Sequence, residues 1–190
     1  MVSHSQPPRV ERLIFGITGR IGSGKTTVGR YLESSYGFQY LRYSAVLADW
    51  QTQDSESKGQ LQQVGWEVMA GGLQAELNRR LIAQISPEGN VAVDGLRHPL
   101  DYETMRSSYF PSFHLLFIDS PPRLRFDRLN RKGKYVDFAS FHTADSHPVE
   151  QQIDSLRTKT ALVIRNEGSL QELYEAVDEC VSHFRKEGQS

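Results

Sequence analysis

Short apolar runs alternate along this chain with longer segments whose apolar residues recur at helical spacing. The short runs predict buried β-strands, and the longer segments predict amphipathic helices. Because a helical segment separates each run from the next, the pattern predicts a parallel sheet covered by helices on both faces. The expected strands are residues 13–18, 38–43, 91–94, 113–118 and 161–164.

A glycine-rich segment joins the first expected strand to a helix. Residues 19–26 read Gly-Arg-Ile-Gly-Ser-Gly-Lys-Thr and fill the pattern G-x-x-x-x-G-K-[ST]. Its backbone N–H groups and the following helix N-terminus suit an anion, so we expect Lys25 to reach the β- and γ-phosphates of a nucleotide and Thr26 to coordinate Mg²⁺. A chance glycine-rich turn is the alternative, but both flanks have the required order. The expected nucleotide-binding residues here are Gly19, Ile21, Gly22, Ser23, Gly24, Lys25, Thr26 and Thr27.

The third expected strand ends in a carboxylate, because residues 91–94 read Val-Ala-Val-Asp. An acid at such a strand end suits Mg²⁺ and its waters, although strand ends also carry Asp as a turn former or a helix cap. Asp94 is therefore a candidate for both the metal site and the acceptor site. Arg97 follows just beyond, where α/β sheets bind substrates, and its planar guanidinium suits a phosphate. A surface ion pair with Asp101 or Glu103 is the alternative for this arginine.

A densely basic segment follows the fourth expected strand. On a helix, Arg125, Arg128 and Arg131 or Lys132 would share one face. Phosphoryl transfer spreads negative charge over the phosphate oxygens, so this face predicts a lid at about 124–147 with Arg125 and Arg128 acting in transfer. Because residues 133–147 carry little sustained apolar periodicity, we expect the lid to be open or disordered without ligand and to close over substrates. A solvated basic face, or a patch for acidic lipid or nucleic acid, is the alternative.

Length and composition bound the class of protein. The 190 residues suit one α/β domain, which we place at 11–190 behind a flexible tail at 1–10. A formal net charge of -1, from 22 basic and 23 acidic residues, favours no broad nucleic-acid or membrane surface. The chain lacks an apolar membrane-spanning stretch and a signal-peptide core, so we expect a soluble cytoplasmic protein. The single cysteine, Cys180, is expected to be a buried structural thiol.

In order along the chain, these elements resemble the P-loop nucleotide kinase family, in particular its adenylate-kinase-like and dephospho-coenzyme-A-kinase-like members. Residues 19–26 resemble the nucleotide loop, and residues 37–44 resemble the second strand that leads to the acceptor site. Residues 94–97, Asp-Gly-Leu-Arg, resemble the family's strand end, and the arginines of the basic segment resemble the lid arginines. Residues 166–169, Asn-Glu-Gly-Ser, resemble the last-strand loop that packs against the base of ATP.

The resemblance implies a three-layer α/β sandwich with a five-stranded parallel sheet, the P-loop NTPase fold of nucleotide kinase type with a helical lid. It also implies that the protein binds ATP and Mg²⁺ and transfers the γ-phosphoryl group to a small nucleotide-type acceptor. Asn166 and Gly168 would then bind the donor nucleotide. The implied acceptor-binding residues are Arg42, Ser44, Asp94 and Arg97.

The acceptor element departs from both of these relatives. Residues 45–49 lack the acid and arginine of adenylate kinases, and Asp49 comes one helical turn later than the base of dephospho-coenzyme-A kinases. A nucleoside monophosphate needs no base, because its attacking oxygen is already anionic. We therefore favour a nucleoside or deoxynucleoside monophosphate, with a dephospho-coenzyme-A-like acceptor kept open. Arg42 ranks above Arg79 and Arg80 as an acceptor-side cation, because the latter two cannot both face inward.

Two other classes of function remain open. A regulatory nucleotide-binding module would keep the loop without transfer, but several arginines on one face argue against it. A kinase acting on a polynucleotide or a modified DNA base would need a basic and aromatic channel, for which Trp50, Trp66, Tyr40 and Tyr43 are the available aromatics. The sequence leaves open the oligomeric state and the choice between ATP and GTP.

Overall fold

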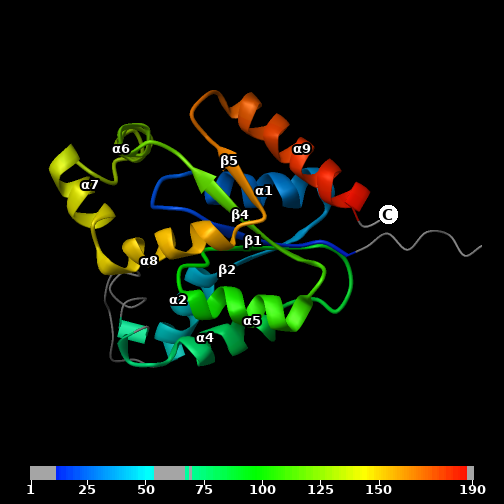
Figure 1. Ribbon diagram of the computed structural model, residues 1–190. Helices are drawn as coiled ribbons and strands as arrows, with labels where there is room; N and C mark the ends of the chain where they lie inside the picture. Colours follow the sequence, from blue (N-terminus) through cyan, green and yellow to red (C-terminus); the bar gives the residue numbers. More distant parts are fainter. Residues whose placement is uncertain (1–11, 54–66, 69, 188–190) are drawn as a thin grey trace, which may run out of the picture.

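The computed structural model describes residues 12–53, 67–68 and 70–187. The expected tail at 1–10 and the aromatic residue Trp66 lie outside the described residues. Within the described part, helices cover both faces of one parallel sheet (Figure 1). The predicted fold class, an α/β P-loop NTPase sandwich around a five-stranded parallel sheet, is confirmed.

The sheet has the strand order β2-β3-β1-β4-β5, and every pairing is parallel. All five expected strands are present, with ends that differ by at most a residue or two from the apolar runs. A strand begins and ends where its ladder hydrogen bonds do, and an apolar run can extend further. Leu13, for example, is apolar and buried but lies before the first residue of β1. The strands are β1 (Ile14–Thr18), β2 (Gln39–Arg42), β3 (Val91–Asp94), β4 (Phe113–Asp119) and β5 (Leu162–Arg165).

Two apolar layers hold the helices to the sheet. One layer, centred on Phe15, packs against α1 (Lys25–Tyr36) and α9 (Leu170–Glu187). The other layer, which includes Val93, packs against helices on the opposite face (Figure 1). Because side chains alternate between the two faces of a strand, β1 and β3 contribute to both layers. The helices of the second face are α2 (Tyr43–Gln53), α4 (Gln74–Ile82) and α5 (Pro99–Tyr109).

Three short helices follow β4; the first two lie beyond its carboxyl end, and the third leads back toward β5 (Figure 1). They are α6 (Pro122–Asn130), α7 (Phe138–Asp145) and α8 (Pro148–Leu156), after which a single 3₁₀ turn leads to β5. Asp137 caps α7, because its side chain accepts a hydrogen bond from the Ser140 N–H at 2.7 Å.

The segment that contains α7 has a small apolar core that the sparse periodicity of residues 133–147 did not predict. Phe141 is completely buried and packs with Phe126 and Leu129 of α6, and Tyr135 is packed against this cluster. Phe141 is the one buried apolar residue of α7, and it anchors the segment; whether the segment opens without ligand stays a prediction. One large aromatic ring holds a short helix without producing a visible periodicity.

The parallel register brings the candidate groups to one edge. Ile17 of β1 pairs with Asp94 of β3, and Arg42 of β2 pairs with Asp94 from the other side. Since the carboxyl ends of parallel strands meet at the same edge, the glycine-rich loop and the β3–α5 turn become neighbours.

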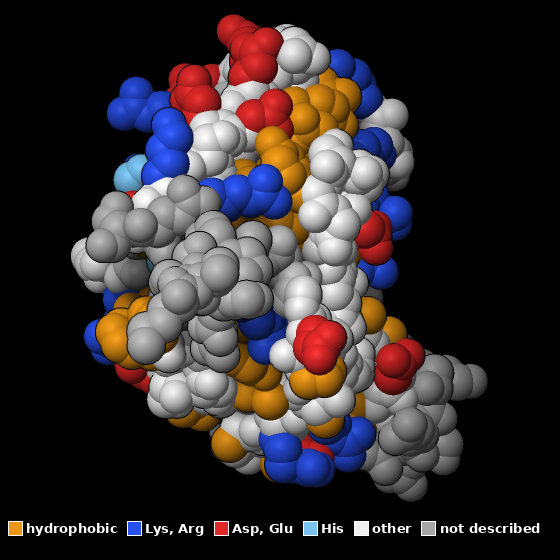
Figure 2. Space-filling model, turned by 90° about the vertical axis from the view of Figure 1, so that its right-hand side faces the viewer, with side chains coloured by type: hydrophobic (Ala, Val, Ile, Leu, Met, Phe, Trp, Pro, Cys, Tyr) orange, Lys and Arg blue, Asp and Glu red, His pale blue; other side chains and the backbone are white. Residues whose placement is uncertain are grey.

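Cys180 is buried in α9, as expected, and burial raises the pKa of its thiol to about 12. No helix among the described residues is both long enough and apolar enough to cross a membrane. On the face shown in Figure 2, the described Lys and Arg side chains are interspersed with Asp and Glu. That mixture gives this face no large field of one sign.

Replacing Phe141 with alanine should destabilise the α6–α7 unit. The ring is completely buried, so its removal should cost about 3–5 kcal/mol locally and raise amide hydrogen exchange across α7. Phe138 is 37% exposed and serves as the matched control. Phe138→Ala removes the same type of ring from a more solvent-exposed position and should destabilise the unit less. Equal exchange in the two variants would contradict the role of Phe141 as the anchor.

Candidate phosphate-binding site

The glycine-rich loop connects β1 to α1 and is supported from the β5 side. Gly24 caps the N-terminus of α1 with a φ of 108°, a left-handed conformation that favours glycine. A Cβ atom at this position would overlap the side-chain amide of Asn166. That amide donates to the Ser23 carbonyl at 2.7 Å. Asn166, expected to contact the donor nucleotide, therefore also holds the loop in place.

Lys25 begins α1 and turns its ammonium group back toward the loop. Its Nζ donates to the carbonyl oxygens of Gly19, at 2.6 Å, and Arg20, at 3.0 Å. Desolvation lowers the pKa of Lys25, and the neighbouring carboxylates Asp94 and Glu150 oppose that shift. The ammonium group of Lys25 thus lies close to the loop backbone and is attracted by the carboxylates of Asp94 and Glu150.

The Asp94 carboxylate is shared by two hydroxyl groups. Its Oδ2 accepts hydrogen bonds from Thr26 Oγ1 at 3.1 Å and from the Tyr40 hydroxyl at 2.7 Å. Burial, followed by the charge of Asp94, raises the pKa of Tyr40, so the phenol keeps the proton that it donates. Sequence reasoning treated Tyr40 only as a strand or channel aromatic. The one feature of the sequence that could have indicated the contact with Asp94 was the position of Tyr40 on β2, the strand next to β3.

The residues at this edge fit a phosphate with Mg²⁺. A hydroxyl and a carboxylate, Thr26 and Asp94, are oxygen ligands of the kind that Mg²⁺ accepts beside phosphate oxygens and water. No cluster of three or more His, Cys, Asp or Glu side chains suited to a metal occurs in the described part of the chain. A metal here would therefore depend on ligand oxygens as well as on the protein, as Mg²⁺ sites of nucleotide-binding proteins do.

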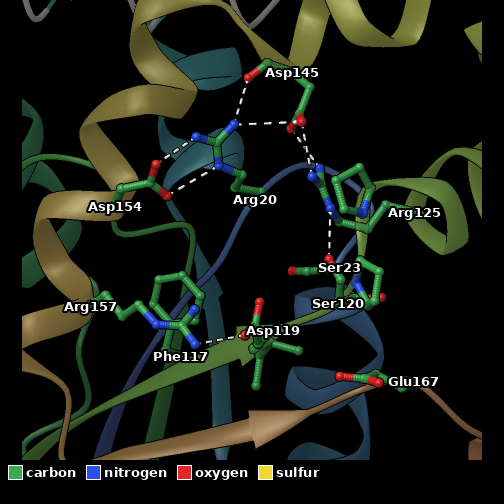
Figure 3. A pocket seen from close by; sticks show the side chains of 13 residues that line it. Arg20, Ser23, Phe117, Asp119, Ser120, Arg125, Asp145, Asp154, Arg157 and Glu167 are labelled. Carbon is green, nitrogen blue, oxygen red and sulfur yellow. Dashed lines mark hydrogen bonds and ion pairs between the residues drawn. The ribbon is translucent and has the colours of Figure 1, made fainter.

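A cavity of about 500 Å³ adjoins the loop on its α8 side (Figure 3). Arg20 and Ser23 line it from the loop, Asp119 and Ser120 from the end of β4, and Glu167 from the β5–α9 loop. The Ser23 hydroxyl is buried and finds no hydrogen-bond partner among the described residues. A buried hydroxyl is normally satisfied, so this group is available to a bound molecule or a water.

Charged side chains of α6 to α8 hold the first residues of the loop (Figure 3). Arg125 forms a bidentate pair with Asp145, at 2.6 and 2.9 Å, and also donates to the Ile21 carbonyl at 3.0 Å. Arg20 donates to the Asp154 carboxylate at 2.6 and 3.1 Å. The leading half of the loop therefore rests on helices that follow it by more than a hundred residues.

The arginines of the basic segment do not form one open face. Arg125 is only 2% exposed, and Asp145 neutralises its charge. Arg128 donates to the Asn166 backbone and side-chain oxygens at 2.9 and 3.0 Å, so it lies at the expected base-binding loop. Burial, followed by the charge of Arg131, lowers the pKa of Arg128. Arg131 itself is exposed. Of the three arginines, Arg128 therefore best matches the expected one, a cation that is partly accessible beside the nucleotide site.

The Arg97 guanidinium pairs with neither of the carboxylates that we considered for a surface pair. Its Nη1 donates to Glu150 Oε1 at 2.9 Å, whereas the Asp101 carboxylate accepts from the Arg97 backbone N–H and Glu103 pairs with Lys159. The second oxygen of Glu150 accepts from the Ile21 N–H at 2.8 Å. The sequence did not single out Glu150. Acids are common in the first turn of a helix, where they interact with the helix dipole, so such a position does not indicate a binding site.

The remaining acceptor-side candidates lie apart from this cluster. Arg42 and Ser44 are exposed at the end of β2 and the start of α2, one strand beyond Asp94. Arg79 and Arg80 both bind Glu76, and the Arg80 guanidinium stacks 4.3 Å from the ring centre of Trp50. Because Arg42 pairs in register with Asp94, its position is compatible with our choice of Arg42 as the first acceptor-side cation. Its role in binding the acceptor stays a prediction.

Replacing Asp145 with asparagine should reduce stability in a pH-dependent way. Burial opposes ionisation of Asp145, but Arg125 and Arg20 outweigh it and hold the pKa of this carboxyl below its usual range. A depressed pKa contributes stability above about pH 4 that is lost as the pH falls through the folded-state value. The variant should therefore lose about 3–5 kcal/mol at pH 7, where Arg125 stays buried without its carboxylate.

Urea denaturation at pH 7, 5 and 3 provides the measurement, and the gap between wild type and Asp145→Asn should shrink toward pH 3. The matched control is Asp119→Asn, which breaks the more exposed pair with Arg157 and should cost no more than about 1 kcal/mol. A gap of constant size across this pH range would show that Asp145 is not ionised in the folded protein.

Comparison with known proteins agrees with this geometry. A family model described as an AAA domain, AAA_18, matches residues 16–138, which is more than half of the chain. A UPF0200 protein from Methanothermobacter thermautotrophicus is 25% identical over 187 residues, covering 93% of each chain.

Two solved structures have a similar fold. TT1252 from Thermus thermophilus superposes with a TM-score of 0.64 at 22% identity, over 91% of this chain and 98% of that one. A gluconokinase from Sinorhizobium meliloti superposes with a TM-score of 0.59 at 14% identity, over 94% and 98%. The glycine-rich loop, the parallel sheet and these matches lead to one assignment: the chain belongs to the AAA_18 family of AAA domains and has the P-loop kinase fold.

Proposed function

We propose that the protein is an ATP- and Mg²⁺-dependent phosphotransferase that moves the γ-phosphoryl group to a nucleotide-type acceptor. The observation that carries the proposal is the hydroxyl–carboxylate pair of Thr26 and Asp94, 3.1 Å apart, beside the Lys25 ammonium. The pair lies at the carboxyl ends of β1 and β3, where α/β sheets bind ligands. We favour a nucleoside or deoxynucleoside monophosphate as acceptor and keep a dephospho-coenzyme-A-like molecule as the alternative.

The donor would be held by the loop. Backbone N–H groups of residues 22–26 and the N-terminus of α1 bind the phosphates, and Lys25 supplies a positive charge to the β- and γ-phosphates. Bound Mg²⁺, held by Thr26 with Asp94 close by, would neutralise charge on the phosphate oxygens. Asn166 and Arg128 come together on the β5 side, which supports a place for the donor nucleoside there.

The acceptor would lie across the sheet edge from the donor. Arg97 follows β3 and keeps part of its side chain exposed, and Arg42 and Ser44 are accessible on the next strand and helix. A phosphate held by these groups needs no deprotonation before attack. Asp49 is a poor base candidate, because it lies on α2 a turn beyond Ser44.

A regulatory nucleotide-binding module is the second candidate. One observation favours it: Asp145 and Glu150 already neutralise Arg125 and Arg97, two of the cations assigned to transfer. Paired arginines would stabilise a transferring phosphoryl group less than free ones. Measured phosphoryl transfer would exclude this candidate.

Replacing Lys25 with alanine should abolish most transfer, with a fall of about 10² to 10³ in turnover, because one preorganised charge at the phosphates is lost. The assay is ADP release from ATP and Mg²⁺ with nucleoside monophosphates, deoxynucleoside monophosphates or dephospho-coenzyme A. Lys159→Ala is the control, since it removes a lysine from a surface pair with Glu103. Full turnover by Lys25→Ala, or no ADP release from wild type with any acceptor, would refute the proposal.

The segment at about 124–147 should act as a lid. When ATP and an acceptor analogue bind together, we expect Arg125 and Arg128 to contact phosphate and the segment to become more protected. Amide hydrogen exchange without ligand, with ATP alone, with the acceptor analogue alone and with both together measures this change. The apolar contacts of Phe141 make protection without ligand substantial, so the expected effect is an increase and not a transition from disorder. Identical exchange in all four states would show a fixed surface segment.

A further inference from the structure

Glu150 is a completely buried carboxylate whose two oxygens bind two different parts of the candidate site. Oε2 accepts from the Ile21 N–H of the glycine-rich loop at 2.8 Å, and Oε1 accepts from the Arg97 guanidinium at 2.9 Å. The loop is on the expected donor side, and Arg97 is on the expected acceptor side. One side chain therefore bridges the two halves of the site.

Such a carboxylate is costly unless its partners are held in place. Removing an ionised carboxyl group from water costs several kcal/mol, which only well-aligned charge-assisted bonds offset. The backbone of Glu150 is held by Val149, Ile153 and Leu156, which are buried along α8. Because the helix is anchored in this way, Glu150 imposes its geometry on Ile21 and Arg97, and does not simply follow theirs.

The position of Glu150 in the first turn of α8 does not by itself explain these contacts. An acid there interacts favourably with the helix dipole even when it is exposed to solvent. Asp154 of the same helix pairs with Arg20 from a position that is 59% exposed, so contact between α8 and the loop does not require burial. What distinguishes Glu150 is the simultaneous contact with Ile21 and Arg97.

We propose that Glu150 is a positioning residue that aligns Arg97 with the phosphate loop and places a negative charge beside the bound triphosphate. The inference rests on the proposed function, because it takes Arg97 as an acceptor-side group. Alignment of donor and acceptor is, together with electrostatic stabilisation, the main way in which a site accelerates phosphoryl transfer. The negative charge weakens binding of the triphosphate before transfer, since like charges repel across a short, poorly hydrated distance.

Glu150→Gln separates these two effects. The amide has one oxygen and an NH₂ group that cannot accept, so it cannot accept from the Ile21 N–H and from Arg97 at once, and the bridge between them is lost. We expect turnover to fall by about tenfold or more, because Arg97 is no longer aligned. We expect ATP to bind roughly three- to tenfold more tightly, with a smaller gain for ADP, because a negative charge has been removed.

Glu150→Asp is the complementary variant. It keeps the charge but is one methylene shorter, so it cannot reach both partners at once. Turnover should fall as in Glu150→Gln, whereas the affinity for ATP should not increase. Glu103→Gln is the control, because it removes an exposed carboxylate from a surface pair with Lys159 and should change turnover by less than about twofold.

A double variant tests whether Glu150 acts through Arg97. If it does, Arg97→Ala with Glu150→Gln should turn over no more slowly than Arg97→Ala alone, because the second change removes a contact already lost. Additive losses would overturn the proposal. Weaker binding of both ATP and ADP by Glu150→Gln would also overturn it, since that result describes general damage to the loop. A turnover loss in Glu103→Gln as large as that in Glu150→Gln would also overturn the proposal.

Calorimetric titration of ATP and ADP keeps this test separate from the proposed function. A wild-type protein that binds ATP but transfers phosphate to none of the acceptors would refute the transferase proposal alone. The Glu150 charge effect would still be decided, because tighter ATP binding by Glu150→Gln but not by Glu150→Asp supports it, and equal affinities refute it.

Discussion

The backbone of Ile21 is the point on which the phosphate loop depends for its shape. Glu150 accepts from its N–H and Arg125 donates to its carbonyl, and both partners come from helices that follow β4. A glycine-rich loop is flexible by itself, since its residues lose much conformational entropy on folding. Charge-assisted bonds at a single residue therefore fix the leading half of the loop, and the Asn166 amide fixes its other half at Ser23.

Charge is balanced locally around this loop, although the chain as a whole is close to neutral. Arg125 and Arg97 each face a buried carboxylate, whereas Lys25 binds backbone carbonyls and Arg128 binds the Asn166 oxygens. Cations that are bonded to neutral groups exchange those partners for phosphate at a lower cost than cations in buried ion pairs. Lys25 and Arg128 are thus the side chains best prepared for a polyphosphate, and Arg125 and Arg97 are held in position by their acids.

Much of the fold followed from local patterns. The apolar runs predicted all five strands, and the signal was clearest for the central strands β1 and β3, which are buried at every position. The pattern of residues 19–26 predicted the strand–loop–helix unit, and the parallel arrangement placed Thr26 beside Asp94. The pattern did not predict the packing of Phe141 against α6, because two aromatics in a polar helix leave no periodic signal.

The sequence by itself determined the fold class, the phosphate loop and the strand end that carries Asp94, since each is encoded by residues adjacent in the chain. Only the tertiary structure decided the partners of the charged groups. Arg97 could have paired with Asp101 or Glu103, yet it meets Glu150, 53 residues away. Many acids lie within reach of any arginine in an unfolded chain, so pairing depends on which helix the packing of α8 brings to the loop. The physical reason is that ion pairing follows distance in space, and apolar packing sets that distance.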